Sequence, residues 1–370
     1  MGQMTKQEIT RMQIKRIEKE IRDTPYHKGT EHHIGRLRAK ISKLKDSLEV
    51  STKKGGGGGY AVKKQGDATI VLVGPPSAGK STLINLLTNA HSKVAPYSFT
   101  TVTVIPGMMK YKNAKIQILD VPGLIEGAEE GKGRGREVMS VVRGADFLIL
   151  ISDIKRPLAL ERIKKALERN RIRINKHLPA VRIQKRLSGG LIIHSNIRQD
   201  LSNLTIKEVA SQMGLKNAEI SINEKMDLDR LIDAFSTNRI YIPAINVLNK
   251  SDQEKLKDMP QISKTEHAVP VEAIKISATK NKGIKKLKEI IWEKLNFVQI
   301  YLVRINEEPN TNAPIISKSG TTLRQISEKI GSSFSERRSR AKIWGPGAKF
   351  PGQEVSLSLM VKEGMMVRFI

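Results

Sequence analysis

The sequence predicts an α/β domain that is interrupted by a small inserted α/β domain and flanked by a helical hairpin and a small C-terminal unit. A glycine-rich loop joins a strand to a helix at residues 70–87, and a second polar loop follows a strand at residues 249–252. The 129 residues from Asp120 to Asn249 are about 70 more than two strand–helix repeats require. We therefore expect an insertion at approximately residues 172–240.

The glycine-rich loop fits the pattern Gly-x-x-x-x-Gly-Lys-Ser at residues 74–81. It follows a short apolar run, rich in β-branched residues, of the kind that forms a strand buried on both faces. Glycines let backbone N–H groups converge on a phosphate, and the following helix N-terminus adds its dipole. We expect Lys80 to reach the β- and γ-phosphates and Ser81 to hold Mg²⁺.

Residues 4–50 predict two helices, with a break at Pro25. Thr5 and Glu8 fit a capping box, and apolar residues recur at helical spacing on both sides of the break. We expect a basic helical hairpin within residues 1–60, whose charged face either binds RNA or is simply solvated. The five glycines at residues 55–59 are typical of a flexible linker.

Two polar segments after the loop helix are placed to respond to a γ-phosphate. Thr100 or Thr101 precedes the strand predicted at residues 102–111 and qualifies as a second Mg²⁺ ligand. Asp120 ends the next predicted strand and is expected to bind Mg²⁺ through water, while the N–H of Gly123 senses the phosphate. The glycine-rich, charged residues 127–136 are typical of a segment that orders with nucleotide.

Further apolar runs complete the expected core. Residues 145–152, 241–248 and 271–276 predict buried strands, and residues 158–167 and 283–295 predict helices.

The second loop, NKSD at residues 249–252, indicates a guanine base. Guanine presents a ring N–H and an exocyclic amine, and one carboxylate accepts from both, which we assign to Asp252. Adenine lacks that amine. Asn249 is expected to tie the two loops together, and the Lys250 stem to cover the ring. A backbone N–H within residues 277–279 would meet the guanine carbonyl.

The charge of the chain favours a polyanionic partner. There are 65 Lys and Arg against 37 Asp and Glu, a formal charge of +28. Nucleic acid is the usual partner of such a chain, and a merely basic surface is the alternative. Residues 169–186 contain seven basic side chains and no acid. We favour RNA contact over solvation there, by Arg182, Lys185 and Arg186.

Residues 298–370 predict a separate small unit of short strands and one helix. It carries a second basic cluster, formed by Arg337, Arg338, Arg340 and Lys342.

The composition also excludes several classes of protein. The chain has no cysteine, which excludes disulfides and thiolate metal sites. No apolar run reaches the roughly 18 residues of a membrane span, and the first ten residues lack the apolar core of a signal peptide. We expect a soluble, cytoplasmic protein with no membrane partner.

Together these motifs resemble the developmentally regulated GTP-binding proteins, a branch of the Obg-related GTPases within the translation-factor-like class. The resemblance is carried by GGGYAVKKQGDA at residues 57–68, GPPSAGKST at 74–82, FTTVTVIPG at 99–107, DVPGLIEGAEEGKGRGR at 120–136 and NKSD. It implies a helical domain at 1–60, a GTPase domain at 68–297 with an insertion of ribosomal-protein-like fold at 172–240, and a β-grasp (TGS) domain at 298–370. It also implies a role on ribosomes or RNA in translation, with a possible regulatory protein partner.

The resemblance further implies a set of site residues. Ser81, Thr101 and Asp120 would bind Mg²⁺, and Lys80, Thr101 and Gly123 would act in catalysis. The GTP or GDP contacts would be Gly74, Pro75, Pro76, Ser77, Ala78, Gly79, Lys80, Ser81, Thr82, Phe99, Thr100, Thr101, Val102, Thr103, Asp120, Val121, Pro122, Gly123, Asn249, Lys250, Ser251, Asp252, Ser277, Ala278 and Thr279.

Two positions depart from related loops. K⁺-activated members carry an asparagine where this chain has Ser77, which puts K⁺ activation in doubt. Leu124 occupies the position where many switch GTPases place a glutamine that orients water, so we expect slow intrinsic hydrolysis.

Our interpretation of the sequence is a GTPase switch. The rivals are an RNA- or ribosome-binding scaffold with a mainly structural nucleotide site and a P-loop ATPase or kinase, which Asp252 argues against.

Overall fold

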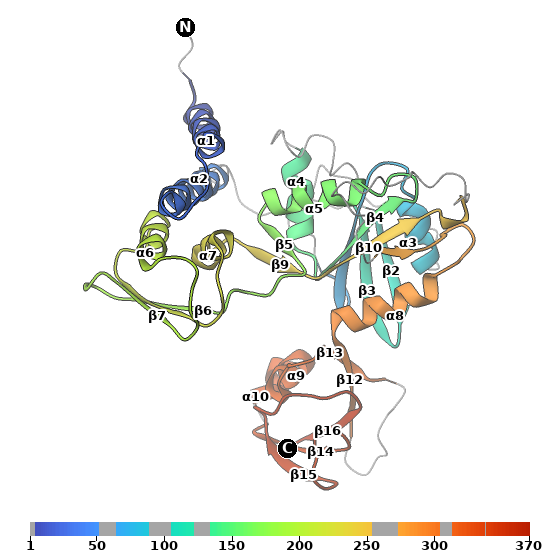
Figure 1. Cartoon of the computed structure of the whole chain (residues 1–370). Helices are drawn as coiled ribbons and strands as arrows, with labels where there is room; N and C mark the ends of the chain where they lie inside the picture. Colours follow the sequence, from blue (N-terminus) through green and yellow to red (C-terminus); the bar gives the residue numbers. More distant parts are fainter. Residues whose placement is uncertain are drawn as a thin grey trace. The chain divides into compact units, whose positions relative to one another are not determined.

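The computed structural model describes residues 4–51, 64–88, 105–121, 134–253, 273–303, 313–336 and 338–370. The chain forms two compact units, shown with the element labels in Figure 1. The insertion unit comprises Met1–Gly59 and Lys176–Tyr241, and the core unit comprises Tyr60–Asn175 and Ile242–Ile370. The α/β fold class predicted from the sequence is confirmed.

A six-stranded sheet of order β11-β10-β4-β1-β3-β2 is the centre of the core unit. All neighbouring strands are parallel except the β2–β3 pair. The strands are β1 (Ala68–Val73), β2 (Ile105–Tyr111), β3 (Ala114–Asp120), β4 (Phe147–Asp153), β10 (Ala244–Asn249) and β11 (Ala273–Lys275). The loops that follow β1, β3 and β10 therefore leave the same edge of the sheet, where ligands of such sheets bind.

Helices cover both faces of this sheet, so its central strands are apolar without alternation. The covering helices are α3 (Lys80–Thr88), α4 (Arg134–Arg143), α5 (Ala159–Arg169) and α8 (Ile284–Leu295). A short 3₁₀ helix, η2 (Ser251–Gln253), follows β10. Leu83 of α3 and Leu287 of α8 share one core with Ile70 and Leu72. The alternate residues of β1 are equally buried, and α4 and α5 lie on the other side of the sheet (Figure 1).

The strand predicted at residues 241–248 is split in two. Pro243 has no N–H to donate to a ladder, and it separates β9 (Ile240–Ile242) from β10. β9 instead pairs with β5 (Ile172–Ile174) in a two-stranded sheet. β5 and β9 are the strands by which the chain leaves and re-enters the core unit.

The C-terminal residues form a five-stranded sheet of order β13-β12-β16-β14-β15 within the core unit. Its elements are β12 (Phe297–Leu302), β13 (Ile315–Lys318), α9 (Leu323–Ile330), α10 (Ser332–Glu336), β14 (Arg340–Trp344), β15 (Gln353–Ser356) and β16 (Met365–Phe369). Phe297 and Ile316 belong to the core of the six-stranded sheet. Lys318 pairs with Asp146 at 3.1 Å, and the Gln299 amide donates to the Lys112 carbonyl at 2.9 Å.

The insertion unit combines the N-terminal hairpin with the inserted residues in one core. Its elements are α1 (Lys6–Asp23), α2 (Glu31–Ser51), β6 (Val181–Lys185), β7 (Leu191–Ser195), α6 (Asn203–Gln212), β8 (Ala218–Ile222) and α7 (Leu228–Phe235). Ile34 and Ala39 of α2 pack with Val209 of α6 and with Leu231 of α7. A Cβ at Gly35 would lie 3.0 Å from Leu228, so the glycine permits the close approach of α2. The predicted capping box of α1 is present at Thr5.

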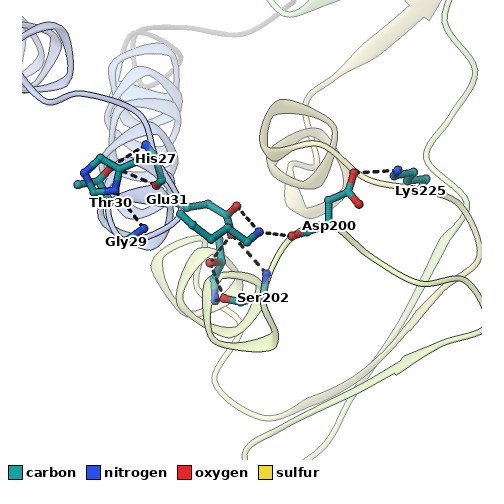
Figure 2. A network of polar contacts seen from close by, with 9 residues as sticks. His27, Gly29, Thr30, Glu31, Asp200, Ser202 and Lys225 are labelled. Carbon is teal, nitrogen blue, oxygen red and sulfur yellow. Dashed lines mark hydrogen bonds and ion pairs between the residues drawn. The ribbon is translucent and has the colours of Figure 1, made fainter.

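A buried carboxylate joins the hairpin to the insertion (Figure 2). Glu31, which is 5% exposed, accepts hydrogen bonds from Lys28 at 2.9 Å, from the Ser202 N–H at 3.3 Å and from the Thr205 hydroxyl at 3.1 Å. Lys28 also donates to the Asp200 carbonyl. Burial alone would raise the pKa of Glu31, but these hydrogen bonds together lower it below its ordinary value of 4.5.

Among the described residues, none of the helices has both the length and the apolar character that crossing a bilayer needs.

We predict that Glu31→Ala weakens the insertion unit by about 2 kcal/mol, because it leaves the buried Thr205 hydroxyl and the partly buried Ser202 N–H without their shared acceptor. Amide hydrogen exchange of α2 and α6 should accelerate about thirtyfold. Because the folded pKa of Glu31 lies below its unfolded value, its contribution is present above pH 4.5 and is lost as the pH falls below that value.

The matched control is Glu18→Ala, which removes an exposed pair with Lys45 between the same two hairpin helices. Such surface pairs contribute less than about 1 kcal/mol. Equal acceleration in the two variants would contradict the importance of the buried contact.

Candidate nucleotide site

The phosphate loop, residues 74–79, connects β1 to α3 in a conformation that only small residues permit at two points. A Cβ at Gly74 would lie 2.2 Å from the Ile151 carbonyl oxygen. Gly79 has a φ of 85°, and a Cβ there would lie 2.3 Å from the side-chain nitrogen of Asn249. Ser77 also adopts a positive φ, of 61°. The glycines are therefore required by backbone approach and by the left-handed conformation.

Lys80 opens α3 and is buried, with 8% exposure. Its ammonium donates to the carbonyls of Gly74 and Pro75, at 3.1 Å each. Burial lowers the pKa of Lys80, and the nearby Asp120 carboxylate opposes that shift. A positive charge at the mouth of a loop of backbone N–H groups is suited to bind phosphate oxygens.

Ser81 and Asp120, both expected to bind Mg²⁺, lie together in the structure. The Ser81 hydroxyl donates to Asp120 Oδ2 at 3.0 Å, and Asp120 Oδ1 is buried with no hydrogen-bond partner within the described residues. Burial raises the pKa of Asp120, while Lys80 and Ser81 act in the opposite direction.

These oxygen donors fit Mg²⁺. The described residues contain no cluster of three His, Cys, Asp or Glu side chains that could hold a metal by themselves. Mg²⁺ needs no such cluster, because it usually keeps several waters and uses one or two protein oxygens together with substrate phosphates. Ser81 and the orphaned oxygen of Asp120 are the residues that would hold it, and the ion would neutralise phosphate charge.

Asn249 joins the phosphate loop to the base loop. It ends β10 with 2% exposure, its side-chain nitrogen donates to the Ala78 carbonyl at 2.9 Å, and its oxygen accepts from the Ala278 N–H at 3.0 Å. The expected tie between the loops is therefore present. Because the Ala278 N–H is engaged by Asn249, this donor is not directed at a base in the structure.

Asp252 is exposed and oriented by the segment at residues 277–279. Its Oδ1 accepts from the Ser277 hydroxyl, and this hydrogen bond lowers the pKa of Asp252. The Ser277 hydroxyl also lies 3.2 Å from that of Thr279. Lys250 adopts a φ of 61° in the turn before Asp252. The carboxylate is thus held in its ionised, accepting form.

Several predicted site residues lie outside the described residues: Phe99, Thr100, Thr101, Val102, Thr103, Pro122, Gly123 and Leu124. The same holds for residues 127–133, while Arg134, Gly135 and Arg136 begin α4. Their expected roles stay predictions.

Sequence reasoning missed a side chain that contacts the phosphate loop. Arg156 donates to the Pro76 carbonyl at 3.1 Å and to Asp153 at 2.6 Å and 2.9 Å. Asp153 ends β4 beside Asn249 in register. The sequence signal for this contact was an acid at the end of a buried strand, followed three residues later by an arginine. Arg156 braces the loop from the neighbouring strand end.

The predicted basic surface is only partly available. Arg182 and Lys185 are exposed on β6. Arg186, which the sequence analysis assigned with Arg182 and Lys185 to RNA contact, pairs instead with Glu219 of β8. Arg171 is buried, with 4% exposure. In the C-terminal cluster, Arg337 lies outside the described residues, Arg338 lies over the Phe334 ring at 5.5 Å, and Arg340 and Lys342 belong to β14.

Comparison with known proteins gives a consistent result. The model of a family described as "50S ribosome-binding GTPase" matches residues 69–183, and that of the C-terminal region of the same domain matches residues 188–297. A GTP-binding protein of Methanocaldococcus jannaschii, itself uncharacterised, is 41% identical over 97% of this chain and 92% of its own length. Developmentally-regulated GTP-binding protein 1 of Xenopus laevis is 37% identical over 98% of this chain and 99% of its own length.

Among solved structures, the G domain of the T. maritima FeoB iron transporter matches with a TM-score of 0.31 and 16% identity, over 61% of this chain and 98% of that chain. We draw no argument from a similarity of this size.

We predict that Asp252→Asn reverses the base preference of the site from GTP to xanthosine triphosphate. The amide offers a donor to the xanthine carbonyl that replaces the guanine amine, whereas GTP loses an acceptor, with a loss of roughly tenfold to a hundredfold. Displacement of a fluorescent nucleotide by GTP and by XTP measures the preference. Asp229→Asn, an exposed change in the insertion unit, is the control. A variant at 252 that still prefers GTP would show that the base is recognised elsewhere.

We also predict that Arg156→Ala lowers the affinity for GTP about fivefold, because one charge-assisted hydrogen bond to the phosphate loop is lost at a partly exposed position. Arg156→Lys should restore part of the affinity. Lys155→Ala removes a neighbouring exposed charge and should have no effect. Equal losses at positions 155 and 156 would indicate a general charge effect instead of bracing of the loop.

Proposed function

The chain belongs to the family of developmentally regulated GTP-binding proteins, and on this premise we propose that it is a Mg²⁺-dependent GTPase switch that acts in the cytoplasm on ribosomes or structured RNA during translation. The observation that carries the GTP part is the bonded path from Asp252 through Ser277–Ala278 and Asn249 to the phosphate loop. This path supports the proposal because it would connect the proposed base site to the proposed phosphate site by hydrogen bonds alone.

The chemistry of hydrolysis needs charge neutralisation and a positioned water. Lys80 supplies a fixed positive charge, and Ser81 with Asp120 provides the donors for Mg²⁺. The residue after Asp-x-x-Gly is Leu124, which cannot hydrogen-bond a water. We therefore propose slow turnover in isolation, roughly 10⁻² s⁻¹ or below, that is raised by a ribosome, a regulatory protein or a cation. K⁺ is the cation to test, although Ser77 replaces the expected asparagine.

Three features support the ribosome or RNA. The family model that matches residues 69–183 is described as ribosome-binding, the chain has a formal charge of +28, and Arg182 and Lys185 are exposed on β6. Phosphate contacts of this kind give affinity that depends on salt and little on sequence.

The experiment that tests the function is GTP turnover by the purified chain with and without ribosomes. We expect slow turnover alone, a clear increase with ribosomes, and loss of both in Lys80→Ala. Leu124→Ala should change the basal rate little, because leucine orients no water. Turnover no higher than that of Lys80→Ala in either condition would instead favour an RNA- or ribosome-binding scaffold with a structural nucleotide site.

We predict that reversing Arg182 and Lys185 to glutamate weakens binding to ribosomes or structured RNA and reduces the slope of log affinity against log salt by about one to two. Arg186 is left unchanged because it pairs with Glu219. GTP affinity should not change. The control reverses Lys207 and Lys216, two exposed side chains of the same unit. An equal loss in the control would show that β6 is not the contact surface.

A further inference from the structure

The C-terminal sheet sorts its side chains onto two faces, because successive residues of a strand point in opposite directions. Ile300 of β12, Ile343 of β14 and Val367 of β16 are buried with Leu323 and Ile326 of α9. The alternate residues of the same strands therefore lie on the face opposite α9.

Three of those alternate residues form an aromatic row. Tyr301 of β12 is in register with Met366 of β16, and Met366 is in register with Trp344 of β14. All three are partly exposed. Since neighbouring strands lie about 4.8 Å apart, the two aromatic residues sit about 10 Å apart across the sheet with a methionine between them.

A basic row lies next to the aromatic row. Arg368 of β16 is in register with Lys342 of β14, and Lys342 is in register with Glu354 of β15. The charge of Glu354 is balanced by Arg340, at 2.9 Å. Arg368 also donates to the Val303 carbonyl at 3.4 Å, and the basic side chains named on this face outnumber the one acid. The two rows also touch, because the Arg368 guanidinium lies 5.4 Å from the centre of the Trp344 ring.

We propose that this face binds an unpaired stretch of RNA, with bases stacked on Tyr301 and Trp344 and phosphates held by Arg368 and Lys342. Every base has a π face that stacks on an aromatic ring, and sheets that present aromatic residues beside cations bind single strands in this way. A protein partner would favour a wider apolar surface than one methionine and two rings beside three cations.

This inference rests on the proposed role on RNA. The binding face of the C-terminal sheet is, however, distinct from the surface formed by Arg182 and Lys185 on β6. The charge on β6 would hold RNA of any shape, whereas stacking requires bases that are not paired. The two surfaces can therefore fail independently.

The test uses the full chain and an eight-residue oligouridylate as the probe. The protein has two tryptophans, and Trp292 is buried with 8% exposure. In a Trp292→Phe background, the fluorescence of Trp344 reports the aromatic row. We expect quenching on addition of the oligonucleotide, with an affinity that falls as salt rises.

Variants separate stacking from charge. Trp344→Ala and Tyr301→Ala should each weaken binding of the oligonucleotide about tenfold. The fluorescence anisotropy of a labelled oligonucleotide measures this affinity. Trp344→Phe should retain most of the affinity because it keeps a stacking ring. Arg368→Gln with Lys342→Gln should flatten the salt dependence. Tyr26→Ala, an aromatic residue 61% exposed in the insertion unit, is the control.

Two results would overturn the proposal: an affinity unchanged in Trp344→Ala, or an equal loss in Tyr26→Ala. Thermal unfolding that matches between Trp344→Ala and Trp344→Phe excludes a folding defect as the cause of lost binding. If the oligonucleotide does not bind while ribosomes still bind with salt dependence, this inference is wrong and the proposed function stands. If neither binds, the RNA role itself fails.

Discussion

The side-chain amide of Asn249 is the contact on which the nucleotide site depends. It lies at the end of a central strand, almost without exposure, and both of its polar atoms are used by backbone groups of other loops. It also fixes the sequence around it. Gly79 must lack a Cβ because the nitrogen of Asn249 occupies that place. A single buried amide therefore joins the loop that we propose identifies the base to the loop that we propose holds the phosphates.

The rest of the site contains charges that the protein alone does not fully satisfy. Lys80 and Asp120 are both buried. Burial lowers the pKa of Lys80 and raises the pKa of Asp120, and each shift favours the neutral form of that side chain. Asp120 Oδ1 has no partner within the described residues. Desolvated charges in this condition favour a ligand that carries the missing opposite charges. The nucleotide phosphate and divalent ion that we propose for this site would supply them, so that ligand binding and relief of buried charge would be one event.

The elements of this fold that depend on a few adjacent residues can be predicted from the sequence. The buried strand before Gly74, the helix that Lys80 opens and the position of Asn249 follow from a few adjacent residues. The helices and strands inside the insertion, including the ten-residue α6, were not predicted individually. The strand β15 and the helix α10 were not predicted either, because both are too short for a periodic pattern. The pairing of Arg186 with Glu219 and of Arg156 with the phosphate loop were also missed, because each joins residues that only the folded sheet brings together. The sequence gives one indication of the shared core of the hairpin and the insertion, which is Gly35 inside a predicted helix. A glycine indicates that another element approaches closely, but it does not identify that element.

The hairpin of β2 and β3 links two regions that the sequence keeps far apart. One end of β3 is Asp120, beside Ser81. At the other end, the turn at Lys112 and Asn113 has positive φ at both positions, and its carbonyl at Lys112 accepts from Gln299 of β12. A β-ladder changes its alignment in whole steps, and a one-residue slip would turn every side chain to the opposite face. The hairpin therefore connects the Asp120 end of the sheet to the strand that carries Tyr301 through one continuous ladder and a single side-chain hydrogen bond. A change of register in that ladder would alter both ends at once.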